Sequence, residues 1–336
     1  MPQAFSLRNA SSEIQRPPRI DPELTRPLSI VARRKLGESN LTVFPVTLGA
    51  SVFGWTADAE SSAAVLDRYR ELGGNVIDTA DSYAGGRSEV IIGEWMRKRR
   101  NRDSTIVMTK IGRSADNPGL GPVSIVRAVE ASLERLQTDR IDVLAFHDDD
   151  RSVALEDSLA TVEWLIESGK VRYLAASNFS AERLIEARIL SSTGLPQFVA
   201  MHVKYNLMDR LPFEGDLRIV AAAQSLGVFP YAALAGGYLT GKYRTKLDAS
   251  TESARGARAL SYYGRRGHRV LAALERVAGE HSTTTASVAI AWLMAKRNVA
   301  APVASATTVE QVDALMAAAG IRLTRAQMLE LDRVSE

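Results

Sequence analysis

Eight short apolar runs, rich in β-branched residues, recur from about residue 45 onward and alternate with longer stretches that have helical spacing. Runs of this kind predict buried strands, and the stretches between them predict amphipathic helices. Eight strand–helix units in succession favour a (β/α)8 barrel. The predicted strands are Val46–Ala50, Asn75–Asp78, Thr105–Lys110, Ile141–His147, Val171–Ser177, Phe198–Val203, Val228–Tyr231 and Ala300–Ser305.

The clearest predicted helix lies between the third and fourth of these runs. Pro122 stands near its start, a position that favours proline. Its apolar face is formed by Ile125, Val129, Leu133 and Leu136. A doubly wound sheet would alternate in the same way, but it usually has a glycine-rich motif after its first strand, and no GxGxxG occurs in this chain. We therefore assign the chain to the α/β class, as a (β/α)8 TIM barrel.

Residues 1–30 differ from the rest of the chain, because five of the 12 prolines fall there among serine, arginine and glutamate residues. This composition predicts an extended or poorly ordered N-terminal arm. We expect residues 31–336 to form a single barrel domain, since α/β barrels of about 250 residues or more are common. The stretch from Gly236 to Gly267 is long for a connection in such a barrel, and long loops in compact domains are usually functional.

Composition narrows the classes of function. The chain has no cysteine, which excludes disulfides, a thiolate nucleophile and cysteine-based metal sites. Its four histidines form neither a cluster nor an HExxH motif, so we expect no metal. The net charge of +3 gives no reason to expect nucleic acid or an anionic membrane as a partner. With no apolar run of roughly 18 residues and no signal-peptide core, we expect a cytoplasmic protein.

Polar residues stand where the second, third and fourth predicted strands end. Asp78 ends the second strand and is followed by Tyr83. Lys110 ends the third strand, and His147 ends the fourth. Because the active site of a barrel forms at the carboxyl ends of its strands, these four side chains are predicted to meet in one cavity. A single lysine after a strand is usually only solvated, but three such ends in succession indicate a functional site.

These residue types suit general acid catalysis on a carbonyl group. A tyrosine hydroxyl has a pKa near 10, and the ammonium group of Lys110 beside it is predicted to lower that pKa. Asp78 is expected to hold the lysine charged and oriented, and His147 to hydrogen-bond the substrate oxygen. None of the four can donate a hydride, so a nicotinamide cofactor is predicted to supply it.

Several segments, in the same order along the chain, resemble motifs of the aldo-keto reductase family. The resemblance covers roughly residues 35–335 and is far more specific than any single motif. The segments are Asn75–Tyr83, similar to a DTAxxY motif, Thr109-Lys110 and Phe146-His147, similar to lysine and histidine motifs, Val171–Phe179, similar to a GxSNF strand, and Tyr205–Arg210 and Leu239–Tyr243.

This resemblance implies an NAD(P)H-dependent oxidoreductase that reduces aldehydes or ketones, or oxidises alcohols in reverse, with Asp78, Tyr83, Lys110 and His147 as its catalytic tetrad. Trp55 is implied to line the substrate pocket together with Tyr83 and His147. The implied cofactor-binding residues are Gly49 and Asp78, Ser177 and Asn178 at the nicotinamide carboxamide, His202, Tyr231 stacked on the nicotinamide ring, Leu234, Gly236 and Lys242 along the pyrophosphate, and Ser305, Thr307 and Gln311 around the adenosine.

Three positions depart from the family pattern. His202 stands where the family usually has glutamine, so we expect a changed contact but not a lost site. Thr307 stands where an arginine commonly meets the 2′-phosphate, so one hydroxyl replaces a planar, bidentate cation. Leu315 replaces an asparagine, and an adenine contact is expected to be missing. We expect the protein to prefer NADP(H) over NAD(H), but with a smaller preference than family members that have the arginine. NAD(H) is the alternative cofactor.

Two functions stay open at this stage. The first is an enzyme with a small carbonyl or alcohol substrate. The second is a cofactor-binding regulatory subunit with little turnover, because the resembling family includes potassium-channel β subunits that keep the tetrad. The sequence names neither a substrate nor an oligomeric state. The run Asp148–Asp150 is expected to be a solvated loop with negative potential at the pocket mouth.

Overall fold

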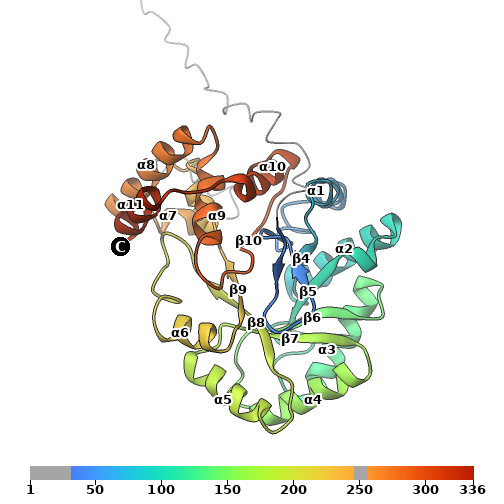
Figure 1. The fold of residues 1–336 in the computed structure, drawn as a ribbon. Helices are drawn as coiled ribbons and strands as arrows, with labels where there is room; N and C mark the ends of the chain where they lie inside the picture. Colours follow the sequence, from blue (N-terminus) through green and yellow to red (C-terminus); the bar gives the residue numbers. More distant parts are fainter. Residues whose placement is uncertain (1–31, 246–255) are drawn as a thin grey trace, which may run out of the picture.

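The computed structural model describes residues 32–245 and 256–336, so the predicted arm over residues 1–30 lies outside the described residues. Eight parallel strands form one sheet in the order β10-β3-β4-β5-β6-β7-β8-β9 (Figure 1). The strands are β3 (Thr47–Gly49), β4 (Val76–Asp78), β5 (Ile106–Ile111), β6 (Ile141–Phe146), β7 (Val171–Ser177), β8 (Phe198–Lys204), β9 (Gly227–Tyr231) and β10 (Val303–Ala304).

The two ends of this sheet meet and close the barrel. The Val228 N–H donates to the carbonyl of Asn298 at 2.9 Å, and the Ala300 N–H donates to the carbonyl of Val228 at 2.8 Å. The prediction of a (β/α)8 TIM barrel is confirmed, and each predicted run contains or overlaps one strand. The eighth strand is shorter than predicted, because only Val303 and Ala304 pair with β3.

Helices surround the strands (Figure 1), and α3 illustrates how the sequence forms them. Pro122 occupies its first turn, its predicted apolar face is buried, and Gln137 ends it with a φ of 51°. The helices are α1 (Ala59–Glu71), α2 (Arg87–Arg99), α3 (Pro122–Leu136), α4 (Leu155–Glu167), α5 (Ala181–Ser191), α6 (Asp216–Ala223), α7 (Gly256–Leu260), α8 (Arg265–Glu280), α9 (Thr285–Met294), α10 (Val309–Ala317) and α11 (Arg325–Ser335). No helix in the described ranges is both long and apolar enough to cross a membrane.

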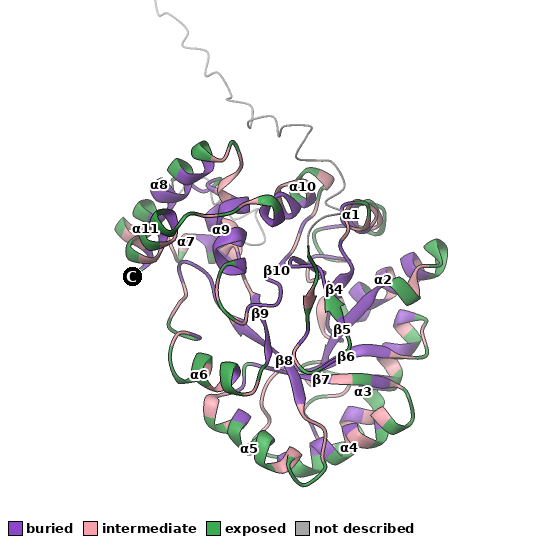
Figure 2. Cartoon of the chain, in the orientation of Figure 1, coloured by how far each residue is buried: buried purple, intermediate pink, exposed green. Residues whose placement is uncertain are grey.

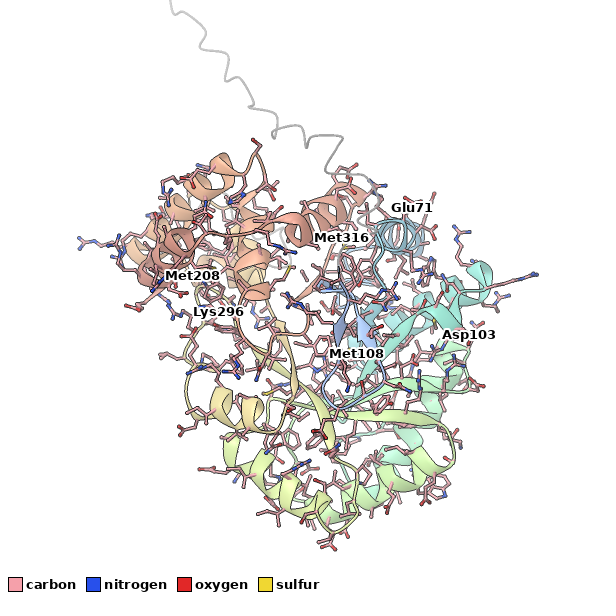
Figure 3. The ribbon with its side chains drawn as sticks, in the orientation of Figure 1. Glu71, Asp103, Met108, Met208, Lys296 and Met316 are labelled. Carbon is pink, nitrogen blue, oxygen red and sulfur yellow. The ribbon has the colours of Figure 1, made fainter. Side chains whose placement is uncertain are left out.

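Most residues of the eight strands are buried, as Figure 2 shows in purple, because one face of the sheet lines the barrel and the other packs against helices. Inside the barrel, Met108 is fully buried and lies near the centre of Figure 3. It packs with other inward-facing side chains in one cluster, which includes Val76, Val143, Ala145, Ala175, Ala200 and Phe229.

A short hairpin covers the amino ends of the strands. Its strands β1 (Arg34–Lys35) and β2 (Thr42–Val43) pair antiparallel. Leu36, Leu41 and Val43 are buried in the same cluster as the barrel interior. The hairpin therefore seals the end of the barrel opposite to the carboxyl ends of the strands, where active sites of this architecture form.

The stretch from Gly236 to Gly267 has more regular structure than the sequence suggested. It contains most of the short 3₁₀ helix η4 (Ala235–Thr240), all of α7 and the beginning of α8, while residues 246–255 lie outside the described ranges.

Candidate active site at the carboxyl ends of the strands

The inward faces of β4 to β9 become polar toward their carboxyl ends. Side chains two residues apart on a strand point to the same face, so Lys110 follows Met108 toward the barrel axis. By the same alternation, His147 follows Ala145, and Asp78 follows Val76 on β4. Further polar residues that continue the inward faces of β7, β8 and β9 are Ser177, His202 and Tyr231. The barrel geometry therefore gathers the predicted residues above an apolar interior.

Asp78 and Lys110 form a buried ion pair. The Lys110 Nζ donates to both carboxylate oxygens of Asp78, at 2.7 and 2.8 Å, and to the carbonyl of Thr79 at 2.7 Å. Burial raises the pKa of Asp78, but the charges of Lys110 and His202 outweigh it and bring the pKa to about 2. Burial lowers the pKa of Lys110, yet Asp78 raises it above its ordinary value. Both groups are therefore charged at neutral pH.

Tyr83 begins the short 3₁₀ helix η2 (Tyr83–Gly86) that follows β4. The Lys110 Nζ lies 5.1 Å from the centre of its ring. Burial raises the pKa of Tyr83, whereas Lys110 lowers it, and the net shift is upward. The sequence argument was right about the direction of the lysine effect but wrong about its outcome. The desolvation of the phenolate outweighs one nearby positive charge that is itself neutralised by Asp78.

His147 lies at the edge of Tyr83, with ring centroids 6.0 Å apart and the planes at 80°. Burial, assisted by the positive charges of Lys110 and Arg113, lowers its pKa to about 2. Its Nδ1 is buried and has no hydrogen-bond partner among the described residues. The imidazole is therefore neutral and can donate to an oxygen only from the nitrogen that carries its proton.

His202, one of the three residues that depart from the family pattern, is fully buried near the carboxyl end of β8. Its Nε2 lies 2.9 Å from Asp78 Oδ1, although the contact lacks hydrogen-bond geometry. Its ring stacks on Phe229 at a centroid distance of 5.3 Å. Burial lowers the pKa of His202. In this structure His202 extends the Asp78–Lys110 pair, a contact that the sequence argument did not foresee.

The end of β7 forms a hydrogen-bond network. Asn178, with a φ of 59°, donates to the carbonyl of His147 at 2.9 Å and to Asp148 Oδ1 at 3.0 Å. It also donates to Ser177 Oγ at 3.2 Å and accepts from the Tyr231 hydroxyl at 2.7 Å. Both the NH2 group and the oxygen of the Asn178 amide are thus hydrogen-bonded within the protein. This amide was predicted to bind the carboxamide of the cofactor.

The segment after β9 brings three predicted residues together. Leu234 and Gly236 lie at the start of η4, and Gly236 and Gly237 have φ values of 66° and 97°. Successive left-handed residues turn backbone N–H groups toward one side and suit a phosphate. A Cβ atom on Gly236 would lie 3.3 Å from Cγ of Arg258, and one on Gly237 would lie 3.4 Å from Cε of Lys242, so the side chains of these two basic residues lie beside this turn.

The remaining cofactor candidates lie around β3 and β10. A side chain at Gly49 would meet Val303 at 2.9 Å, so only glycine fits there beside Ser305. Gln311 Oε1 accepts from the Thr307 N–H at 2.9 Å and from its hydroxyl at 3.3 Å, which ties these two residues to each other at the N-terminus of α10. Leu315 is 4% exposed and belongs to the core, which explains why it offers no polar contact.

Trp55 lies in the turn after β3 and is 56% exposed. Among the ring contacts of the described residues, none joins Trp55 to Tyr83 or His147. Its place in the substrate pocket therefore stays a prediction.

The acidic run after His147 is bound to cations and to backbone N–H groups, and negative potential at the pocket mouth stays a prediction. Asp148 pairs with Arg113, and Asp149 pairs with Arg183 at 2.8 Å. Asp150 accepts backbone N–H groups. The described part of the chain contains no group of three acidic or histidine side chains that could hold a metal ion.

Sequence reasoning missed two charged residues at the site. Arg113 stands three residues after Lys110, beyond the strand end, and its position carried no motif. Asp81 lies inside the segment Asn75–Tyr83 and is 2% exposed, yet neither of its carboxyl oxygens has a hydrogen-bond partner among the described residues. Burial, with a smaller contribution from Glu89, raises the pKa of Asp81 to about 6.

Comparisons with known proteins agree with this geometry. The family model described as "Aldo/keto reductase family" matches residues 45–336. A protein named "Probable voltage-gated potassium channel subunit beta" from Oryza sativa subsp. japonica is 31% identical over 83% of this chain and 88% of its own. "Norsolorinic acid reductase" from Aspergillus flavus is 30% identical over 88% of this chain and 78% of its own. "Probable aryl-alcohol dehydrogenase AAD4" from Saccharomyces cerevisiae is 30% identical over 82% of this chain and 88% of its own. The chain therefore belongs to the aldo/keto reductase family.

Proposed function

We propose that this oxidoreductase uses NAD(P)H to reduce the carbonyl group of a small aldehyde or ketone to an alcohol, or catalyses the reverse reaction. One observation carries the proposal. The Lys110 ammonium binds Asp78 and lies 5.1 Å from the Tyr83 ring, while the neutral His147 stands at the edge of that ring. A proton donor, a fixed positive charge and a neutral hydrogen-bond donor thus converge on one point, as reduction of a carbonyl requires.

The roles of the residues follow from their charges. When bound, the nicotinamide supplies the hydride that reaches the carbonyl carbon. The Tyr83 hydroxyl delivers a proton to the carbonyl oxygen as negative charge develops there. Lys110 stabilises the phenolate that remains, and Asp78 keeps Lys110 charged and in place. His147 donates a hydrogen bond to the same oxygen and orients the substrate.

The residues present fit a dinucleotide. The left-handed turn at Gly236 and Gly237, flanked by Lys242 and Arg258, supports a pyrophosphate site. Tyr231 is half-buried and presents a ring near the catalytic groups. For Asn178 to bind the carboxamide, its bonds to Asp148 and Tyr231 have to rearrange.

Turnover tests the proposed function. Purified protein is mixed with NADPH or NADH and a panel of aldehydes and ketones, and cofactor consumption is followed at 340 nm. We expect reduction of at least some of these carbonyl compounds. Cofactor binding without turnover on any of them would contradict the proposal.

We expect the pH profile of kcat/KM for reduction to be flat between about pH 5 and about pH 9, with no histidine step near 6.5. His147, with a pKa of about 2, stays neutral over this range, and Tyr83, with its pKa raised, stays protonated. Above the raised pKa of Tyr83 the proton donor is lost, and the rate falls. Asp81 has a pKa of about 6, so Asp81→Asn is the control. A step near pH 6.5 that persists in Asp81→Asn contradicts the assignment of a neutral His147.

We propose NADP(H) as the preferred cofactor, by a smaller margin than with an arginine at position 307. Thr307→Arg is expected to tighten NADPH binding about tenfold and to leave NADH binding nearly unchanged, because a charged hydrogen bond to the 2′-phosphate replaces a neutral one. Fluorescence titration gives both dissociation constants. Thr193→Arg, at an exposed turn after α5, adds the same charge elsewhere and should change neither constant. Tighter binding of NADH than NADPH by the unaltered protein would disprove the preference.

A second function is favoured by one observation, the similarity to a relative named as a channel β subunit. On this alternative the chain is a cofactor-binding regulatory subunit with little turnover. The same assay separates the two functions. Reduction at ordinary enzymatic rates, roughly 1 s⁻¹ or faster, favours the enzyme, and slow single turnovers favour the regulatory subunit. We also retain, as proposals, a single barrel domain over residues 31–336 and a cytoplasmic location.

A further inference from the structure

One cation at the mouth of the site has no part in the proposed chemistry. The Arg113 guanidinium contacts Asp148 through Nε and, at 2.6 Å, through Nη2. Arg113 follows Lys110 by three residues, and Asp148 directly follows His147. Asn178 donates to the same carboxylate. The pair thus bridges the ends of β5, β6 and β7 beside the proposed catalytic groups.

Arg113 is anchored at the mouth of the site, because its partner Asp148 directly follows His147 and accepts a hydrogen bond from Asn178. Burial raises the pKa of Tyr83, and Arg113 acts against that rise. Burial also raises the pKa of Tyr231. Arg113 lowers this pKa, and its effect is larger than the rise that Asp148 causes. Positive potential therefore reaches Tyr83 and Tyr231, although the net charge of the pair is zero.

Arg113 is also accessible to a ligand. Its side chain is 47% exposed, and that of Asp148 is 42% exposed. An ion pair with this exposure contributes only about 0–1 kcal/mol, so a ligand carboxylate can compete with Asp148 for the guanidinium. The other cations near the site have different partners or positions. Lys110 is occupied by Asp78, and Arg258 lies beside Gly236, on the side proposed for the pyrophosphate.

We infer that Arg113 determines specificity by binding an anionic group of the substrate, so that the preferred substrates are carbonyl compounds that also carry a carboxylate. This inference rests on the proposed carbonyl reduction. Arg113 has the planar donor edge that carboxylates bind bidentately, and Asp148 now occupies that edge. A substrate carboxylate that takes this edge would direct its carbonyl group toward Tyr83 and His147.

The test compares 3- and 4-carboxybenzaldehyde with their methyl esters, which carry a similar ring but no charge. The measured quantity is the ratio of kcat/KM for acid to kcat/KM for ester, with the NADPH dissociation constant measured in parallel. We expect a ratio above one for at least one isomer, and a loss of about tenfold in Arg113→Leu because a charged hydrogen bond disappears. Asp148→Asn removes the competing carboxylate and should raise the ratio about two- to fivefold.

Arg151→Leu is the matched control. Arg151 pairs with Asp149 on the same loop and is 71% exposed, so its removal changes the net charge equally and should leave the ratio unchanged. The inference is overturned if Arg113→Leu lowers acid and ester turnover equally, or weakens NADPH binding without changing the ratio. Absence of reduction of both the acids and the esters by the unaltered protein is a different failure, because it contradicts the proposed function itself.

Discussion

Tyr83→Phe is expected to lower carbonyl reduction about 10²–10³-fold and to leave NADPH binding unchanged. The reason is that the variant loses the hydroxyl that we propose protonates the developing alkoxide, and loss of a preorganised donor at such an oxygen typically has this effect. The phenyl ring keeps its place over Lys110, so the packing of the site is retained. Steady-state kinetics with a good aldehyde and a fluorescence titration with NADPH give the two quantities.

The matched control for this prediction is Tyr173→Phe. Its hydroxyl accepts the Asn40 N–H at 3.2 Å, at the hairpin end of the barrel and far along β7 from the proposed site. We expect the control to reduce carbonyl compounds at the unaltered rate. Equal rates for Tyr83→Phe and the unaltered protein would remove Tyr83 from the mechanism.

Lys110→Met is expected to lower carbonyl reduction by about 10²-fold or more, with the greatest loss at neutral pH and above. Without the ammonium group, the proton transfer from Tyr83 leaves a phenolate with no positive charge beside it. The variant also removes the ammonium group that compensates the buried Asp78 carboxylate and leaves it only the contact with His202, which costs about 3–5 kcal/mol of the free energy of unfolding. Kinetics across the pH range and a denaturant titration measure the two effects.

The double variant Lys110→Met with Asp78→Asn separates stability from catalysis. Removing both charges of a buried pair restores much of the stability that the single change loses. It does not restore the positive charge at Tyr83, so activity should stay low. Recovery of activity along with stability would show that Lys110 acts only through folding.

The architecture of this protein and the location of its candidate active site could be predicted from the sequence. Runs of β-branched residues between helical stretches are local patterns, and they predicted all eight strands of the barrel. Since side chains alternate along a strand, the strand-end positions of Asp78, Lys110 and His147 already implied that they would meet. The motifs around these residues resemble those of the aldo/keto reductase family, whose family model matches residues 45–336.

The electrostatics of the site could not be predicted in this way, because a pKa depends on how far a group is removed from water and on charges from distant segments of the folded chain. Lys110 lies beside Tyr83 as predicted, yet burial reverses the net shift in the pKa of Tyr83. The network around Asn178 and the Arg113–Asp148 pair join residues from separate strands, and no local pattern encodes them. Residue type and spacing predict which side chains lie close together. How far these side chains are removed from water, and which hydrogen-bond or ion-pair partners they have, depends on how the barrel packs.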